Sequence, residues 1–441
     1  MQRFPLGALA LAVAAIFAGS AHAQSLQELY DSARATDATY QSAKAQYDAN
    51  LAKADQAKAG ILPTAGLSAG LNRNLLDSVN PTLDKDYTTQ TAALSGTQPL
   101  YRPANWITYE QGKKSVEVAQ AQLVVAEQDL VVRVAQAYFD VLAASDTLTF
   151  VRAQKAAVAE QLASAKRNFE VGTATITDTR EAQARFDLAR SQEIAADNDL
   201  LVKKIALDTI VGKTNAQPTP LAQPAVLPNV EEADVYKWVS QAEGASPNVQ
   251  QALVALDVAR LETQKAKAGN LPTLDLTAAY NVNRYPNGTS SLPNGSRNNS
   301  TVVGLSLNIP LFAGFSVQNR IRETLSLEDK AQADLDAVRR SVAQSTRTAF
   351  YGVLSGLGQV QALEAAESSS QIALDANKLG YQVGVRINID VLNAQSQLFQ
   401  TKRDLAKARY DVLVGGLKLR QASGQLKPED LQSVNTLLLP Q

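Results

Sequence analysis

The chain of 441 residues is poor in the side chains on which most enzymes and metal sites depend. It contains no cysteine, one histidine (His22) and one methionine (Met1). Both single residues lie in a segment that we expect to be removed, so the mature chain lacks all three types. This composition excludes disulfides, zinc sites built from His or Cys, cysteine nucleophiles and Ser-His triads. Chemistry based on carboxylates alone or on a Ser-Lys pair stays open.

The chain also lacks an excess of positive charge and has few aromatic residues. Its net charge is −1, from 42 Lys and Arg against 43 Asp and Glu. Nucleic-acid binding requires a basic face, so we expect no nucleic-acid partner. Aromatic residues make up only 6% of the chain, whereas Ala and Gln fill long segments. Small residues at helical spacing predict closely packed helices in thin walls rather than a thick globular core.

Residues 1–23 have the features of a secretory signal peptide. Arg3 supplies a positive charge, residues 6–17 form an apolar run, and residues 21–23 form an Ala-X-Ala cleavage site. The run is too short to span a membrane as a helix. No cysteine follows the cleavage site, so a lipid anchor of the bacterial lipoprotein kind is not expected.

Two related stretches organise the chain. Residues 380–395 read GYQVGVRINIDVLNAQ, and residues 168–183 read NFEVGTATITDTREAQ. The aligned positions are Gly172 with Gly384, Ile176 with Asn388 and Asp178 with Asp390. In the later stretch we expect a tight turn between two helices, with Asn388 capping the second helix and Asp390 complementing its dipole. The recurrence predicts an internal tandem repeat.

We expect two repeats of the same organisation, residues 24–229 and 230–441. After an initial helix, the first has a β-hairpin, a long helix, a helix and a linker, at 62–100, 103–170, 177–211 and 212–229. After its own initial helix, the second has a β-hairpin, a long helix, a helix and a C-terminal tail, the first three at 272–310, 314–381 and 388–422. Each long helix would measure about 100 Å, so it must pack along other helices as in a coiled coil.

The hairpins are predicted from strict alternation of apolar and polar residues. Leu67, Ala69 and Leu71 alternate with polar or small residues, as do Val303 and Leu305. The first hairpin is expected to have a long polar loop over residues 75–86. Strands of this length and pattern suit a membrane β-barrel, although each run taken singly is equally typical of an ordinary sheet.

Four strands cannot close a barrel, and lipid does not tolerate an open sheet edge. Closure must therefore come from other copies of the chain. Two copies would give eight strands and an interior filled by side chains, whereas three would give twelve and begin to leave a pore. A conducting channel therefore favours three copies.

The chain resembles the TolC family of outer-membrane efflux and secretion channels along its mature length. The resemblance lies in the tandem repeat, the two AKAGxLPT segments, the QPL and IPL strand ends and, above all, GYQVGVRINIDVLNAQ. It implies a homotrimer that combines a twelve-stranded membrane β-barrel with a barrel of long coiled-coil helices, located in the outer membrane and extending into the periplasm. It implies no cofactor and no enzymatic activity.

The same resemblance implies an exit duct for inner-membrane efflux pumps or type I secretion systems. The implied partners are outer-membrane lipid, a periplasmic adaptor (membrane fusion) protein, and an inner-membrane pump or ABC exporter. The sequence does not indicate whether drugs or a secreted protein pass through.

The resemblance also implies particular site residues at the closed inner end of the channel. A latch of polar bonds is implied at Gln161, Thr177, Asp178, Tyr381 and Arg386. A constriction ring is implied at Asp390 and, one turn later, at Asn393, where the family commonly has Asp. Alternatively, Asp178 and Asp390 only complement helix dipoles and Arg386 is solvated.

Other residues are expected to mark the membrane borders. Tyr101, Trp106, Phe312 and Phe315 lie where strands become helices, and we expect an aromatic girdle there, with plain packing as the alternative for Trp106. Four basic residues near the outer loops are expected to be solvated, with lipopolysaccharide phosphates as the alternative contact: Arg73, Lys85, Arg284 and Arg297.

Two other functions compete with the exit duct. A periplasmic structural or adaptor coiled-coil protein would also have long helical hairpins, but four amphipathic strands and the lack of a membrane anchor argue against it. A carboxylate-dependent periplasmic hydrolase is disfavoured because Asp and Glu do not cluster and His is missing.

Overall fold

The computed structural model describes residues 24–79, 82–222, 227–228, 234–289 and 294–439. The expected signal peptide, residues 1–23, lies outside the described residues. The chain divides into two compact units, and each takes segments from both predicted repeats. Unit 1 comprises Met1–Ala43, Leu123–Pro247 and Arg339–Gln441, and unit 2 comprises Lys44–Gln122 and Asn248–Val338.

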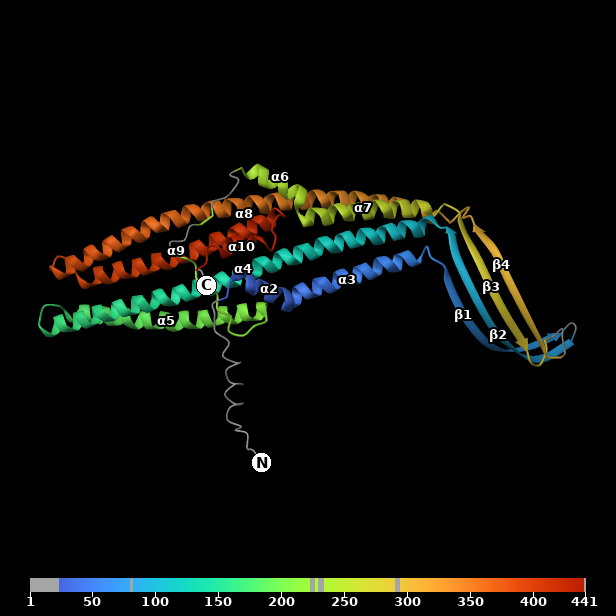
Figure 1. The fold of residues 1–441 in the computed structure, drawn as a ribbon, viewed down its shortest axis with the longest axis horizontal. Coiled ribbons are helices and arrows are strands. Elements are labelled where there is room, and N and C mark those ends of the chain that lie inside the picture. Colours follow the sequence, from blue (N-terminus) through green and yellow to red (C-terminus); the bar gives the residue numbers. More distant parts are fainter. Residues whose placement is uncertain (1–23, 80–81, 223–226, 229–233, 290–293, 440–441) are drawn as a thin grey trace, which may run out of the picture. The chain divides into compact units, whose positions relative to one another are not determined.

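Unit 2 contains a four-stranded antiparallel sheet in the order β1-β2-β3-β4 (Figure 1). Its strands are β1 (Thr64–Val79), β2 (Thr82–Tyr101), β3 (Thr273–Tyr285) and β4 (Ser296–Asn308). The two hairpins are joined by the pairing of β2 with β3. Among the described residues, strands β1 and β4 therefore each have one edge without a partner strand.

The expected long loop over residues 75–86 is wrong. Leu75 pairs with Asp86, and the ladder continues to Val79 opposite Thr82, so residues 75–79 and 82–86 belong to the two strands. The polar composition of this stretch misled the prediction, because backbone pairing with a neighbouring strand does not require apolar alternation. Strand β4 begins at Ser296, within the range 272–310 expected for the second hairpin.

Long helices lead out of the sheet. Helix α4 (Pro103–Glu170) follows β2 and helix α8 (Ser316–Gln382) follows β4, while α3 (Ala38–Ala59) and α7 (Pro247–Ala268) precede β1 and β3. At the junction, Arg102 Nε donates a hydrogen bond to Asp275 Oδ1 over 2.7 Å. Gly112 lets α4 approach α3 closely, since a Cβ there would lie 3.0 Å from the Cβ of Ala57.

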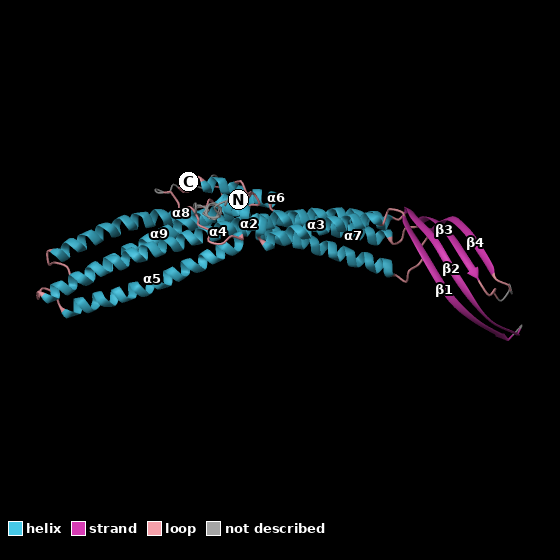
Figure 2. Ribbon diagram, turned by 60° about the horizontal axis from the view of Figure 1, so that its bottom comes forward, coloured by secondary structure: helices cyan, strands magenta, loops and turns pink. Residues whose placement is uncertain are grey.

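Unit 1 is built from helices (Figure 2). Helix α4 turns back into α5 (Ile176–Val211), and α8 turns back into α9 (Asn388–Ala422). Both turns place a glycine in the left-handed region, Gly172 at φ 79° and Gly384 at φ 81°. Other residues adopt this conformation only at a cost, which explains the glycine in both turns.

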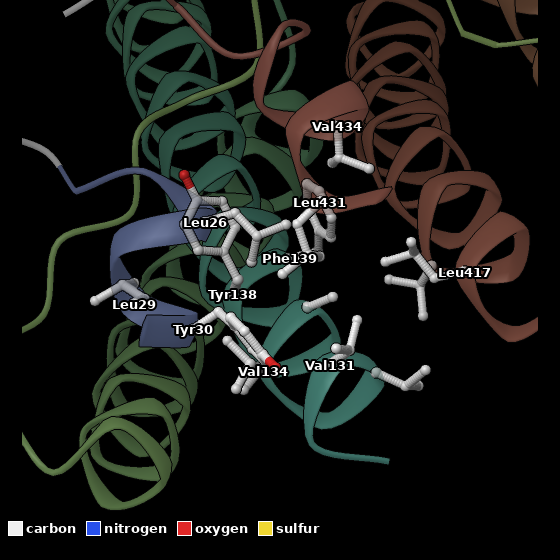
Figure 3. Packing of buried hydrophobic residues seen from close by; sticks show 14 of the residues in the cluster. Leu26, Leu29, Tyr30, Val131, Val134, Tyr138, Phe139, Leu417, Leu431 and Val434 are labelled. Carbon is white, nitrogen blue, oxygen red and sulfur yellow. The ribbon is translucent and has the colours of Figure 1, made fainter. Parts of the chain in front are cut away.

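The main core of unit 1 surrounds Tyr138 and Phe139 of α4 (Figure 3). Buried side chains from α2 (Leu26–Thr36), α5, α9 and α10 (Asp430–Asn435) pack around them. The Tyr138 hydroxyl donates to the carbonyl oxygen of Thr219 over 2.9 Å. A further short helix, α6 (Val235–Ala245), packs Trp238 against α8 and α9. The small helix α10 was not expected from sequence.

Two carboxylates in unit 1 have contrasting environments. Arg133 holds Asp37 with two hydrogen bonds of 3.0 Å, and these bonds lower the pKa of Asp37. Burial instead raises the pKa of Asp146, whose Oδ2 accepts a 2.7 Å hydrogen bond from the Tyr410 hydroxyl. Tyr410 also stacks on Phe139, with ring centroids 5.6 Å apart, so α4 and α9 are joined by packing and by this polar bond.

None of the helices in the described part of the chain combines the length and apolarity needed to cross a membrane.

Candidate functional site at the helix turns

Asn388, the first residue of α9, is the most buried polar residue near the two turns, with 1% of its surface exposed. Its side-chain oxygen accepts a hydrogen bond from the Gln161 amide of α4. Its side-chain nitrogen donates to the carbonyl oxygen of Asp178 in α5 over 3.3 Å. One amide thus joins three helices, and we call Gln161, Asn388 and the Asp178 carbonyl the amide knot.

The expectation that Asn388 caps α9 is wrong. The N-cap residue is Ile387, and it makes no side-chain capping bond. Asn388 lies one position inside the helix, where its side chain is free to reach α4 and α5 instead. Apolar packing beside the knot supports this arrangement, since Leu162 of α4, Ala182 of α5 and Leu392 of α9 form one buried cluster.

The other expected latch residues lie around the turns but do not bind one another within one chain. Tyr381 accepts a 3.1 Å hydrogen bond from the side chain of Asn168. The Asp178 carboxylate caps its own helix, in a capping box with Thr175. Thr177 is exposed. Arg386 is exposed, and its Nη1 lies 3.7 Å from Asp390 Oδ2 in an i,i+4 ion pair.

The expected ring residues also have partners within the chain. Asp390 is partly exposed and forms an ion pair with Arg386. It lies in the first turn of α9, where the helix dipole stabilises a negative charge. Asn393 is exposed, and its side-chain oxygen accepts a 2.9 Å hydrogen bond from Arg185 of α5. A basic residue therefore lies beside the position where an acid is expected in relatives.

The expected girdle residues lie in unit 2, where strands meet helices. All four have exposed side chains: Tyr101, Trp106, Phe312 and Phe315. Phe312 and Phe315 pack edge to face, with ring centroids 5.3 Å apart. Such an aromatic edge can lie at a membrane interface.

Within the residues that the structure describes, no group of His, Cys, Asp and Glu side chains could hold a metal ion. Of the carboxylates expected at the site, Asp390 is paired with Arg386 and Asp178 is used as a helix cap. The arrangement binds α4, α5 and α9 to one another through the amide knot.

Asn388 and Arg185 are the residues that sequence reasoning missed as cross-helix contacts. Asn388 differs from Ile176, the aligned residue of the first repeat. This replacement of an apolar residue by an amide at the same place was the available signal. Arg185 carried no signal, because charged residues are common on exposed helix faces.

Comparisons with known proteins agree on one family. A family model described as outer membrane efflux protein matches residues 29–213 and 238–425. The outer membrane protein TolC of Vibrio cholerae is 32% identical over 413 residues, which cover 94% of this chain and 93% of that protein. The alkaline protease secretion protein AprF of Pseudomonas aeruginosa is 30% identical over 422 residues, covering 94% of this chain and 87% of that protein.

The fold has solved counterparts as well. The outer membrane protein VceC of Vibrio cholerae superimposes with a TM-score of 0.79 at 18% identity, covering 90% of this chain and 96% of that chain. At this level of identity the likeness concerns the fold.

Proposed function

The chain belongs to the outer membrane efflux protein family, and from this premise we propose that three copies form a channel-tunnel through the outer membrane and across the periplasm. It is an outer-membrane exit channel of the kind used in efflux and type I secretion. The family consists of channel proteins rather than enzymes. A periplasmic adaptor role is not favoured.

The main support for the proposed trimer is the open sheet. In the part of the chain that the structure describes, strands β1 and β4 each leave one edge without a partner. One face of the sheet carries exposed apolar residues: Leu67, Leu71, Leu94, Leu276, Val303, Leu305 and Leu307. Lipid does not tolerate unpaired backbone groups. If β4 of one copy pairs with β1 of the next, three copies close a twelve-stranded barrel with a water-filled interior.

The repeated order of elements supports the predicted tandem repeat and the tunnel. Two helices, two strands, a long helix and a returning helix occur from α2 to α5 and again from α6 to α9. Helix α4 with α5 forms one helical hairpin and α8 with α9 another, so three chains would supply six helical hairpins to one tube. Each hairpin contributes one long helix, α4 or α8, whose length suits a passage across the periplasm.

We propose that the latch of the closed inner end has an intrachain part and an interchain part. The amide knot is the intrachain part and holds α9 against α4 and α5. Arg386, Thr177 and Tyr381 have side chains left to reach a neighbouring copy. Three Asp390 carboxylates would then lie together and attract cations.

We propose that an adaptor protein docks on the turns. Each turn exposes apolar side chains that face water in the single chain: Val171 and Ile176 on the first turn, and Val383, Val385 and Ile387 on the second. Exposed apolar groups at both turns suit contact with helical hairpins of a partner. Such a partner would connect the channel to an inner-membrane pump or ABC exporter.

Conductance and crosslinking test the proposal together. The natural chain has no cysteine, so one cysteine on β1 (Ala69→Cys) and a scan of single cysteines on β4 give a clean background. Strands β1 and β4 lie at opposite edges of the sheet, so disulfides can form only between copies. We expect crosslinked species that end at three copies, and ionic current in planar bilayers. Monomers alone, or trimers without current in every variant, would refute the channel.

A further inference from the structure

Arg284 of β3 and Arg297 of β4 form a basic pair at the turn end of the second hairpin. They are direct cross-strand partners, and both side chains are exposed. The sequence has no Asp or Glu between Asp275 and Glu323. Within the described residues, Arg297 Nε donates to Asn299 Oδ1 over 3.1 Å, and neither arginine has an acidic partner. Like charges directly opposite each other on a sheet repel, so an anion between them would stabilise the pair.

The first hairpin handles its basic residues differently. Arg73 is bound by Asp86 on the neighbouring strand, with Nε 2.8 Å from Oδ2. The Lys85 ammonium donates to the carbonyl oxygen of Thr289 over 2.6 Å. The charge of Arg73 is therefore compensated within the protein, whereas the pair of Arg284 and Arg297 is not.

The basic pair lies on the apolar face of the sheet. Residues two apart on a strand share a face, and the cross-strand pairs below Arg284 and Arg297 on this face are Val282 with Asn299, Tyr280 with Thr301, Ala278 with Val303, Leu276 with Leu305, and Leu274 with Leu307. This is the face that carries the exposed leucines of the sheet, together with Val303. The two arginines therefore end the column that faces lipid in the proposed barrel.

The height of this column matches a membrane. Ten residue steps separate Leu274 from Arg284, which is about 34 Å of strand at about 3.4 Å per residue. A strand tilt of about 40° reduces this length to roughly 26 Å along the membrane normal, and the apolar band of such barrels is about 25 Å tall. The arginines therefore lie where hydrocarbon gives way to headgroups.

We propose that Arg284 and Arg297 bind a phosphate group of the phosphorylated glycolipid, of the lipid A type, in the outer leaflet. The proposal rests on the proposed function, which places the hairpin turns on the outer side. Guanidinium forks match the geometry of phosphate oxygens and bind them in two-point contacts. Beside the pair is a hollow of ≈ 760 Å³, whose lining includes Gln90, Tyr285 and Ser296 and which has room for the sugar of the headgroup.

The test compares a charge-removing variant with a matched control. The variant is Arg284→Gln with Arg297→Gln, and the control is Arg73→Gln, which removes an arginine that already has an acidic partner. Each full-length protein is freed of native lipid and bound to phosphatidylcholine vesicles with diphosphoryl lipid A, with its dephosphorylated form, or with neither. Inorganic phosphate is added as a competitor. Conductance in phosphatidylcholine bilayers verifies that each variant has assembled.

We expect the wild-type protein and Arg73→Gln to prefer the phosphorylated glycolipid by at least about tenfold, as two charge-assisted contacts imply. The double variant should lose this preference while keeping its conductance. If it fails to assemble, the single variants Arg284→Gln and Arg297→Gln should each lose several-fold. An unchanged double variant, an equal loss in Arg73→Gln, or equally tight binding of inorganic phosphate would overturn the assignment. Absence of conductance in the wild type would instead refute the channel itself.

Discussion

Replacing Asn388 by leucine tests whether the amide knot holds the channel closed. Leucine has nearly the size of asparagine but can make neither the bond to Gln161 nor the bond to the Asp178 carbonyl. Each lost hydrogen bond costs about 1 kcal/mol net, so the closed state loses about 2 kcal/mol. At 1.4 kcal/mol per factor of ten, the opening equilibrium shifts roughly 30-fold toward the open state.

The assay is the current of single channels in planar bilayers at fixed voltage. Asn388→Leu should raise the time spent in the high-conductance state, and Gln161→Leu should do so less. Because the two residues share one bond, the double variant should fall short of the sum of the single effects. Asn377→Leu is the matched control, since the Asn377 amide bonds only within its own helix, to the carbonyl oxygen of Ala373.

Three results would contradict a latch role of the amide knot. If Asn388→Leu conducts like the wild type while a charge change at Arg386 opens the channel, the knot persists in the open state and is not part of the latch. Strict additivity of Gln161→Leu and Asn388→Leu would mean that the two side chains do not act on each other. A similar effect of Asn377→Leu would point to general loosening of the helices.

Three other perturbations follow from the structure. Burial raises the pKa of Asp146, so the protonated Asp146 carboxyl contributes stability in acid, and this contribution is lost as the pH rises through the pKa of the folded state. Asp146→Asn, which can still accept the Tyr410 hydrogen bond, should therefore raise Tm at pH 7.5. The gain should vanish below about pH 4, where the carboxyl is also protonated in the unfolded chain. A gain that is equal at both pH values would contradict this. Gly384→Ala has free space for its methyl group but forces alanine to φ 81°, so the free energy of unfolding measured with denaturant should fall by about 1–2 kcal/mol. The control Gly358→Ala lies in the interior of α8 with equal space, and its free energy of unfolding should rise by about 1 kcal/mol. Asp390→Asn should lower the preference for cations several-fold in reversal-potential measurements under a salt gradient, and an unchanged reversal potential would remove the acidic ring.

Local signals made the helices and turns predictable. The expected range 103–170 coincides with α4, because Pro103 suits the first turn of a helix and no further proline interrupts the run. Gly172 and Gly384 marked the two turns because only glycine takes up their φ values freely. The strands were recognised from their period of two, and the described residues contain a sheet of four strands.

Signals that depend on distant partners could not be recognised. The strand character of residues 75–86 depends on pairing between β1 and β2 and not on composition. The role of Asn388 depends on Gln161 and the Asp178 carbonyl, which lie more than 200 residues away in the sequence. From the local sequence alone, an Asn followed by an Asp two residues later indicates a helix cap.

The open edges of the sheet have a genetic consequence. In the proposed ring each copy must offer a competent β1 to one neighbour and a competent β4 to the other. A proline in the middle of β4 would remove a hydrogen-bond donor from the pairing with β1 of the next copy. One such mutant copy would then disrupt a ring that also contains two wild-type copies. If a wild-type and a mutant copy are expressed equally in one cell and mix at random, only about one ring in eight would consist entirely of wild-type chains. Mutations at these two edges should therefore be dominant, whereas mutations in the interior of the helices should be recessive.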